Sequence, residues 1–336
     1  MEKCPILSAG PGTANSKQLE ALGFSLIVCK KYFSHQEKLL RPNWQAATFH
    51  IAFALALSAA SLYGIASQSV LGQALGVFLG AFAQLLWFVL LHECGHRTLF
   101  PKQAANDLFG HFAGFAAIIP YSLWKDVHAR HHLWAGWKDL DPTTRTVAQA
   151  APSGCKKSLI NGFWYLRIPV FGLVYRLSNF WNPGMCRRGK RQGLISIALT
   201  ILPWIVIFEL FWPQRMALLL THGLFLVLFE TIMLSQHTHI PQSRACGRKV
   251  LPYRSTEQVK VTRSLNFPQP FALWFLLNFN EHEKHHEFPN IPGYYLHRVA
   301  GSGTRRVHWF RWWRDSHAVP GATLLFDDES RTGIYI

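Results

Sequence analysis

Histidines are the side chains in this sequence best suited to chemistry. The chain has 336 residues and 17 histidines, and ten of them lie in four short motifs, HECGH, HARHH, SQHTH and HEKHH; nine of these ten are the main candidates. Histidines spaced at i, i+3 and i+4 share one face of a helix. The nine are His92, His96, His128, His131, His132, His237, His282, His285 and His286.

Metal binding is the chemistry that this pattern predicts. Imidazole is the commonest neutral metal ligand in proteins, and it suits iron, zinc and copper. Nine imidazoles exceed the three or four ligands of one zinc ion, so two metal ions are indicated. Zinc activates water, which suits polar substrates. A site beside the long apolar runs described below suits a lipid chain instead, and attack on its unactivated methylenes needs an oxidant made from O2 at a redox metal. We therefore predict two iron ions with O2 as co-substrate, and zinc as a substitute acquired during purification.

Further residues near the motifs are candidates for supporting roles. His239 is a possible alternative ligand to His237. Acidic side chains near the histidines are expected to orient imidazole N–H groups; these are Glu93, Asp126, Glu230, Glu281 and Glu283. Three tryptophans flank HARHH and are candidates for the wall of a substrate channel; these are Trp124, Trp134 and Trp137.

A competing metal site would use Glu-x-x-His pairs inside a helical bundle. Glu93 with His96 and Glu283 with His286 have this spacing. That design leaves the HARHH motif and His237 without roles, so we favour the histidine-only site.

Four long apolar runs must position these residues. They cover residues 47–66, 70–91, 193–212 and 216–236, in a chain that is 49% hydrophobic. About 20 apolar residues suffice for a helix to cross a bilayer core. We therefore predict an all-α membrane protein with four transmembrane helices in two hairpins and a helical cap that holds the histidines.

The distribution of charge predicts the orientation of these spans. Residues 97–193 hold 14 Lys and Arg against four Asp and Glu, whereas the links 67–69 and 213–215 hold one Arg together. This is the positive-inside pattern, so both termini and the metal site are expected on the cytoplasmic side. The same pattern explains the net charge of +16 by the position of basic residues next to membrane lipids. We therefore expect no nucleic acid as a partner.

The expected division is an N-terminal arm (1–43), a membrane domain with its cap (44–300) and a C-terminal tail (301–336). The apolar stretch 108–124 is short and contains Pro120. It is expected not to cross the membrane, because crossing would place HECGH and HARHH on opposite sides.

The motifs together resemble those of the membrane fatty acid desaturases. HECGHRTLF, IIPYSLWKDVHARHH, SQHTHIP and HEKHHEFPNIPGYYL are similar to elements of the delta-12/omega-3 acyl-lipid branch. The resemblance implies a four-span di-iron enzyme with the nine histidines as ligands, acting on an acyl chain carried by a lipid, CoA or acyl carrier protein. No cytochrome b5-like segment is recognised, so ferredoxin or cytochrome b5 is expected to supply electrons.

Two kinds of alternative stay open at this stage. A related di-iron hydroxylase, acetylenase or carotenoid ketolase would share the same ligand set. A metal transporter belongs to a different class and would place histidines along a path at mid-membrane depth. The motifs instead fall at one end of the predicted spans, which favours the enzyme.

Overall fold

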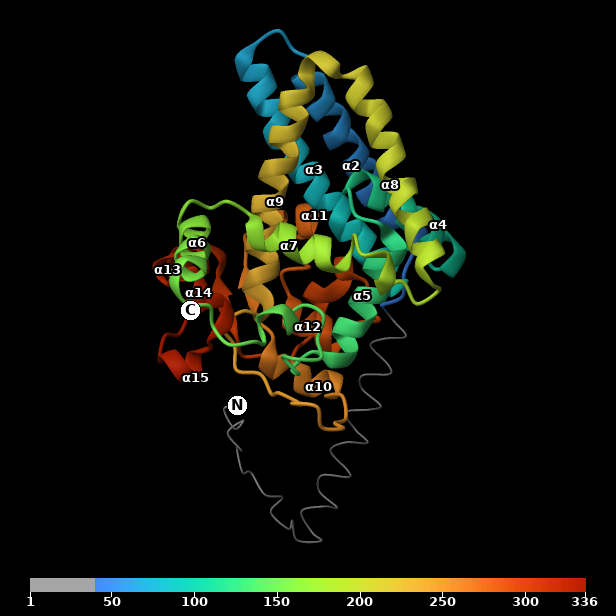
Figure 1. The fold of residues 1–336 in the computed structure, drawn as a ribbon. Helices are drawn as coiled ribbons and strands as arrows, with labels where there is room; N and C mark the ends of the chain where they lie inside the picture. Colours follow the sequence, from blue (N-terminus) through green and yellow to red (C-terminus); the bar gives the residue numbers. More distant parts are fainter. Residues whose placement is uncertain (1–39) are drawn as a thin grey trace.

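Four long helices stand together and define the shape of the molecule (Figure 1). The computed structural model describes residues 40–336, so most of the predicted N-terminal arm lies outside the described residues. The four helices are α2 (Trp44–Ile65), α3 (Val70–His96), α8 (Lys190–Leu210) and α9 (Arg215–His237). Each is long and apolar enough to cross a membrane, as the sequence predicts.

Helix α3 is the central helix of the bundle. Its most apolar window is 67% buried, against 17–33% for the other three candidate spans. Tight packing against α2 depends on Gly76, because a Cβ there would lie 2.4 Å from the backbone nitrogen of Ile65. The Ser61 hydroxyl donates to the Gly76 carbonyl at 2.8 Å. Asn43 begins α2 by accepting a hydrogen bond from the Ala46 amide, a normal N-cap.

The segment 108–124 does not form one continuous helix. Helix α4 (Gln103–Ala116) ends at a turn in which Ile118 has φ 55°, and α5 (Tyr121–Trp134) starts after Pro120. Proline and the left-handed residue prevent a straight helix through this point. HECGH at the end of α3 and HARHH in α5 therefore come to the same end of the molecule.

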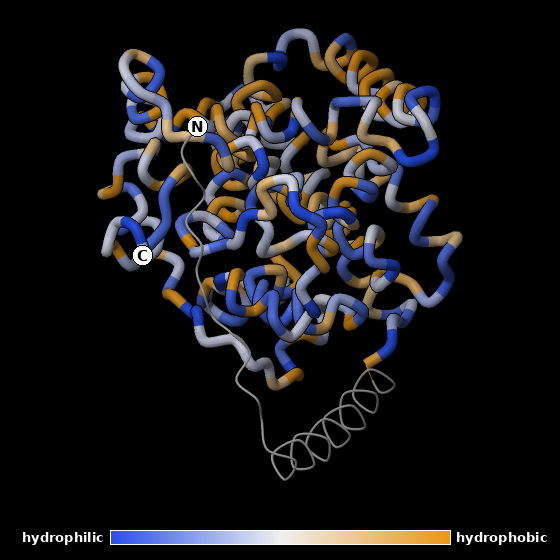
Figure 2. Tube along the Cα trace, turned by 60° about the horizontal axis from the view of Figure 1, so that its bottom comes forward, coloured by the Kyte–Doolittle hydropathy of each residue, from blue (hydrophilic) through white to orange (hydrophobic). Residues whose placement is uncertain are grey.

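Apart from the 3-10 helix Trp212–Gln214, which links α8 to α9 at the opposite end, the remaining elements gather at that end and along the flank of α9 (Figure 1). They are α6 (Gly154–Tyr165), α7 (Val170–Asn179), α10 (Ser255–Gln258), α11 (Gln269–Leu276), α12 (His282–Glu287), α13 (Trp309–Ala318), α14 (Gly321–Phe326) and α15 (Glu329–Thr332), with short 3-10 helices at Arg145–Val147, Pro183–Met185, Trp212–Gln214, Val259–Val261 and Gly293–Arg298. Hydrophilic segments are spread over this end of the molecule (Figure 2).

The all-α expectation needs one correction. Strand β1 (Ser264–Asn266) pairs in parallel with β2 (Arg306–His308), with Leu265 opposite Val307. The pairing joins the region before α12 to the C-terminal residues. Three-residue strands leave no readable alternation in sequence, so this sheet was not predicted.

Candidate metal centre

Eight of the nine predicted histidines form two groups, in each of which the candidate ligand atoms lie within 4.8 Å of one another. The first group is His92, His96, His128 and His285, and the second is His131, His237, His282 and His286. The ninth, His132, lies beside the first group, with its Nε2 3.0 Å from Nε2 of His285 and 3.1 Å from that of His128. Helices α3, α5, α9 and α12 supply all nine.

The spacing of the nitrogens suits a metal ion. Neighbouring Nε2 atoms lie 2.8 Å apart for His96 and His128, and 2.9 Å apart for His237 and His282. The other close pairs within the two groups lie 3.1–3.2 Å apart. Ligand nitrogens about 2.1 Å from a metal and at right angles to one another would lie about 3 Å apart.

The outer nitrogens of three of the four histidines in the second group face acceptors. His131 Nδ1 lies 2.9 and 3.0 Å from the two carboxylate oxygens of Asp141. His286 Nδ1 lies 2.7 Å from Oε1 of Gln258, and His237 Nδ1 lies 3.0 Å from the Val261 carbonyl. Each Nδ1 therefore carries the proton, and each Nε2 directs a lone pair inward.

The charge state of the histidines agrees with this arrangement. Burial, followed by the neighbouring imidazoles, lowers the pKa of five of the cap histidines well below the usual value. Those histidines are His128, His132, His282, His285 and His286. Neutral imidazoles with lone pairs directed at common points repel one another, and a cation at each point would remove that repulsion.

Asp141 is a site residue that the sequence did not single out. It follows α5 in the segment KDLDPTT and is 1% exposed. Although burial acts to raise the pKa of Asp141, the hydrogen bonds from His131 and the Thr143 amide help to lower it overall. The Thr143 amide donates to it at 2.8 Å, which fixes the carboxylate. The only signal in the sequence was a turn-forming Asp-Pro pair. That pair does not distinguish an aspartate that contacts a metal-binding histidine from an ordinary aspartate in a turn.

Gln258 is a second residue that the sequence did not single out. Its Nε2 donates to the His132 carbonyl at 2.7 Å while its Oε1 faces His286. It thus connects the HARHH and HEKHH motifs. Nothing in the motif pattern points to a glutamine 28 residues before His286.

Glu93 occupies the position expected of a group that orients a ligand. Its Oε1 lies 3.2 Å from His92 Nδ1, and its Oε2 accepts from the Thr98 hydroxyl at 2.7 Å and from the Gly293 amide at 2.8 Å. It therefore ties HECGH to the turn that follows HEKHH. A side chain on Gly293 would collide with the Leu277 carbonyl, at 2.5 Å, so glycine is needed there.

The other four acidic candidates bind elsewhere, and their predicted contact with an imidazole is corrected. Asp126 accepts from the Arg187 amide, Glu281 pairs with Lys284 and Arg306, Glu283 accepts from the Arg305 amide, and Glu230 accepts from the Gly172 amide. Glu281 and Glu283 are next to ligands in sequence, and a residue next to a helical ligand generally points to another face.

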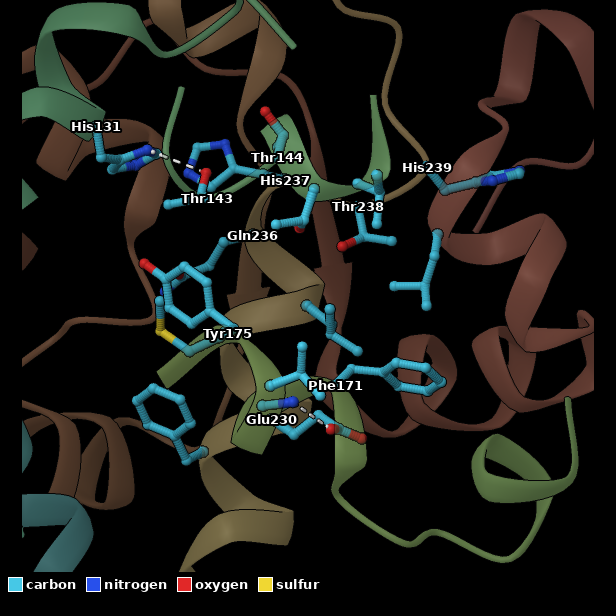
Figure 3. Close-up of a pocket in the computed structure, with 18 of the residues that line it drawn as sticks. His131, Thr143, Thr144, Phe171, Tyr175, Glu230, Gln236, His237, Thr238 and His239 are labelled. Atoms are coloured by element: carbon cyan, nitrogen blue, oxygen red, sulfur yellow. Dashed lines mark hydrogen bonds between the residues drawn. The ribbon is translucent and has the colours of Figure 1, made fainter. Parts of the chain in front are cut away.

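His239 belongs to neither group of histidines, so the structure gives no support to it as an alternative ligand to His237. Its backbone has φ 62°, and its Nε2 lies 3.0 Å from the Thr332 hydroxyl. Figure 3 shows its ring directed away from His237.

A cavity of about 430 Å³ opens beside the histidines. Phe88, Trp124, Phe229 and Phe279 line it near the metal-binding groups, and side chains of α6 and α7 line it farther out. Of the three predicted channel tryptophans, Trp124 lines this cavity, while Trp134 and Trp137 are not among its lining residues. Trp137 instead stacks on Tyr253 and donates to the Leu251 carbonyl.

Glu230 lies in the same cavity, below His131 and His237 in Figure 3. Its Oε2 accepts from the Gly172 amide at 2.6 Å, and it also accepts from the Phe171 amide. These amides belong to the first turn of α7, where N–H groups have no partner within the helix. Glu230 therefore fixes the start of α7 on the wall of the cavity.

Comparison with known proteins gives a consistent set of similarities. The family described as fatty acid desaturase matches residues 68–318. An sn-1 oleoyl-lipid 12-desaturase of Synechocystis sp. is 27% identical over 263 residues, covering 72% of each chain. A Delta(12)-oleate desaturase of Trichosanthes kirilowii is 37% identical, over 48% of this chain and 50% of its own. An sn-1 acyl-lipid omega-3 desaturase (ferredoxin) of Nostoc sp. is 29% identical, over 33% of this chain and 31% of its own.

Proposed function

The chain belongs to the fatty acid desaturase family and is a fatty acid desaturase, and on that premise we propose that its nine clustered histidines hold two iron ions that serve this reaction. The proposed reaction removes two hydrogens from neighbouring methylenes of an acyl chain. It consumes one O2, two electrons and two protons, and it releases two waters.

The observation that carries the proposal is the inward direction of the imidazole lone pairs. Asp141, Gln258 and the Val261 carbonyl hold the outer nitrogens of His131, His286 and His237. The inner nitrogens are thereby left as ligands without protons. An all-nitrogen ligand set suits iron, zinc or copper, and a redox metal supplies the oxidising power that an unactivated C–H bond requires.

The protein's own residues would position the substrate. The cavity passes His131 and His237 and continues to the aromatic group of Phe88, Trp124 and Phe279. An acyl chain in this cavity would have its middle beside the histidines and would be shielded from bulk water. Holding one C–H bond against the reacting centre determines which carbons react.

We propose an acyl lipid as the substrate and a ferredoxin or cytochrome b5 as the electron donor. The names of the Synechocystis and Nostoc relatives support an acyl-lipid substrate, and the Nostoc name also supports ferredoxin. The Trichosanthes name supports an oleoyl chain and a new bond at carbon 12. CoA and acyl carrier protein are the alternative carriers that the experiment below distinguishes.

We further propose two transmembrane hairpins with the histidines on the cytoplasmic side. The apolar helices α2, α3, α8 and α9 and the basic segment 97–193 support this orientation. We assign residues 44–300 to the membrane domain and 301–336 to a tail that packs on it through β2.

Expression in a host of known lipid composition tests the activity. Profiling of lipid-bound, CoA-bound and acyl-carrier-protein-bound chains over time should show a new double bond, appearing first in the lipid fraction. A hydroxylated chain in place of the alkene would assign the chain to the hydroxylase alternative.

Metal content tests the site directly. Purified protein reconstituted with iron should bind two iron ions, and His285→Ala and His286→Ala should each lower that number. A single metal that both variants retain would reject the two-metal site. Zinc found after purification would not, because zinc outcompetes ferrous iron for nitrogen ligands.

A further inference from the structure

One part of the cavity wall is polar, although the proposed substrate is a hydrocarbon chain. Gln236, His239 and Gln242 line the cavity where α9 ends. Among the described residues, twelve buried side-chain nitrogen and oxygen atoms lack a hydrogen-bond partner, and three of them belong to Gln236 and Gln242. A buried polar group without a partner is costly, so this concentration points to an absent polar occupant.

Gln236 is the most exceptional of the three. It is 2% exposed, and neither its Nε2 nor its Oε1 has a partner. It precedes the proposed ligand His237, and Figure 3 shows it between that histidine and Glu230. Its amide offers donors and an acceptor together. A saturated acyl chain can match neither of them, whereas water matches both.

Resting on the proposed function, we propose that Gln236 holds ordered water beside the metal centre and that this polar wall carries water out and protons in. Each turnover joins two acyl hydrogens, two protons and the two oxygen atoms of O2 into two waters, with two electrons from the external donor. Both the protons and the waters must therefore pass through a site lined by hydrocarbon. Gln236 would act as a positioning residue.

The surrounding residues provide a route and the room for it. Gln242 donates through its Nε2 to the His237 carbonyl at 3.2 Å, which leaves its Oε1 as a bare acceptor on the cavity wall. Tyr175 and Thr143 add hydroxyl groups to the same cavity. A cavity of about 430 Å³ has room for several waters, because a single water needs roughly 10–15 Å³ of such space.

The other part of the wall suits the acyl chain. Phe171 and Val174 of α7 and Met233 and Leu234 of α9 contribute apolar surface to the cavity. The chain and the water can therefore occupy different sides of one cavity. Separate sides would keep water away from the reacting methylenes while leaving it within reach of the histidines.

Gln236→Met tests the proposal, because methionine keeps the length of the side chain and removes both polar atoms. The matched control is Gln73→Met, since Gln73 contacts the Ser67 carbonyl at the far end of α3. Iron-loaded, full-length protein in lipid nanodiscs is used for a high-resolution density map. The same samples give double bonds formed per O2 consumed, and the ratio of rates in H2O and D2O.

We expect water density on the Gln236 amide in the wild type and none in Gln236→Met. That variant should keep its iron, form at least threefold fewer double bonds per O2 and at least double its D2O effect, and Gln236→Asn should be intermediate. The proposal would be overturned if the wild type showed no water density on the Gln236 amide, or if Gln236→Met lost its iron. It would also be overturned if Gln236→Met matched Gln73→Met in double bonds per O2 and in its D2O effect. A wild type that makes no double bond would reject the proposed function instead.

Discussion

Both carboxylate oxygens of Asp141 lie within 3.0 Å of His131 Nδ1, in a pair that is almost completely buried. This contact joins the loop after α5 to the second histidine group. It determines which nitrogen of His131 carries the proton, and so which nitrogen can bind a metal.

Asp141→Asn should weaken metal binding at the second group. An asparagine keeps the shape but loses the charge that supports the protonated Nδ1. Loss of such an outer partner typically lowers metal affinity or activity 10- to 100-fold. Iron titration monitored by absorbance would measure the change.

Asp139→Asn is the control for this variant. Asp139 lies in the same loop, but its carboxylate accepts from the backbone amides of Ala245 and Cys246. We expect its iron affinity to stay within threefold of the wild type. Equal losses in both variants would mean that Asp141 only stabilises the loop.

Glu230→Gln should retain most product formation, whereas Glu230→Leu should not. A glutamine can still present an oxygen to the Gly172 amide, but leucine leaves the first turn of α7 without an acceptor. Loss of an N-terminal helix cap costs about 0.5–2 kcal/mol. Thermal unfolding and fatty acid profiling at equal expression would measure both effects; a Gln variant as impaired as the Leu variant would show that the charge itself matters.

Gly95→Ala should disturb the metal centre from within α3. A Cβ at residue 95 would lie 2.3 Å from Cζ3 of Trp124, whose indole stacks on the His128 ring at 4.5 Å. Overpacking of this kind costs about 1–3 kcal/mol. We expect lower iron content and lower product formation.

Gly162→Ala is the matched change in a helix without such contact. Nothing lies within 4 Å of a Cβ at residue 162 in α6. Alanine is favoured over glycine inside a helix by roughly 0.5–1 kcal/mol, so stability should be equal or higher. A similar loss in both variants would contradict the packing explanation for Gly95.

The stability of the metal-free protein should fall as the pH falls below about 6.5. The five cap histidines with lowered pKa are neutral in the folded chain, but they bind protons in the unfolded chain below their ordinary pKa. Their contribution is therefore fully present above about pH 6.5 and is progressively lost below it.

Thermal unfolding of the metal-free protein between pH 5 and 8 would measure this loss. Saturation with metal should move the decline to lower pH, because metal and protons compete for the same nitrogens. An unfolding temperature that stays constant from pH 7 to pH 5 would contradict the neutral, buried state of these histidines.

The sequence predicted the elements that have their own local signal. Long apolar runs identify α2, α3, α8 and α9, and the i, i+3, i+4 spacing identifies the face on which His282, His285 and His286 lie. Pro120 marks the break that returns α5 to α3.

The partners of these histidines were harder to predict because they depend on tertiary contacts. Asp141 and Gln258 come from loops and a short helix whose positions are fixed by distant segments. Glu281 and Glu283 are adjacent to ligands in sequence but point to the far side of α12, where arginines bind them. Glu93, in contrast, lies within 3.2 Å of the neighbouring His92.

The pairing of His92 with His285 has a consequence for how the protein is made. These two imidazoles meet across 193 residues of chain. When the ribosome has completed α3, the HECGH motif has no partner from α12, and it stays incomplete until synthesis passes residue 286. If the groups bind metal as proposed, loading would be a late event in biogenesis. A nascent chain that is arrested after α9 would already contain the four candidate spans of the described residues but could complete neither group.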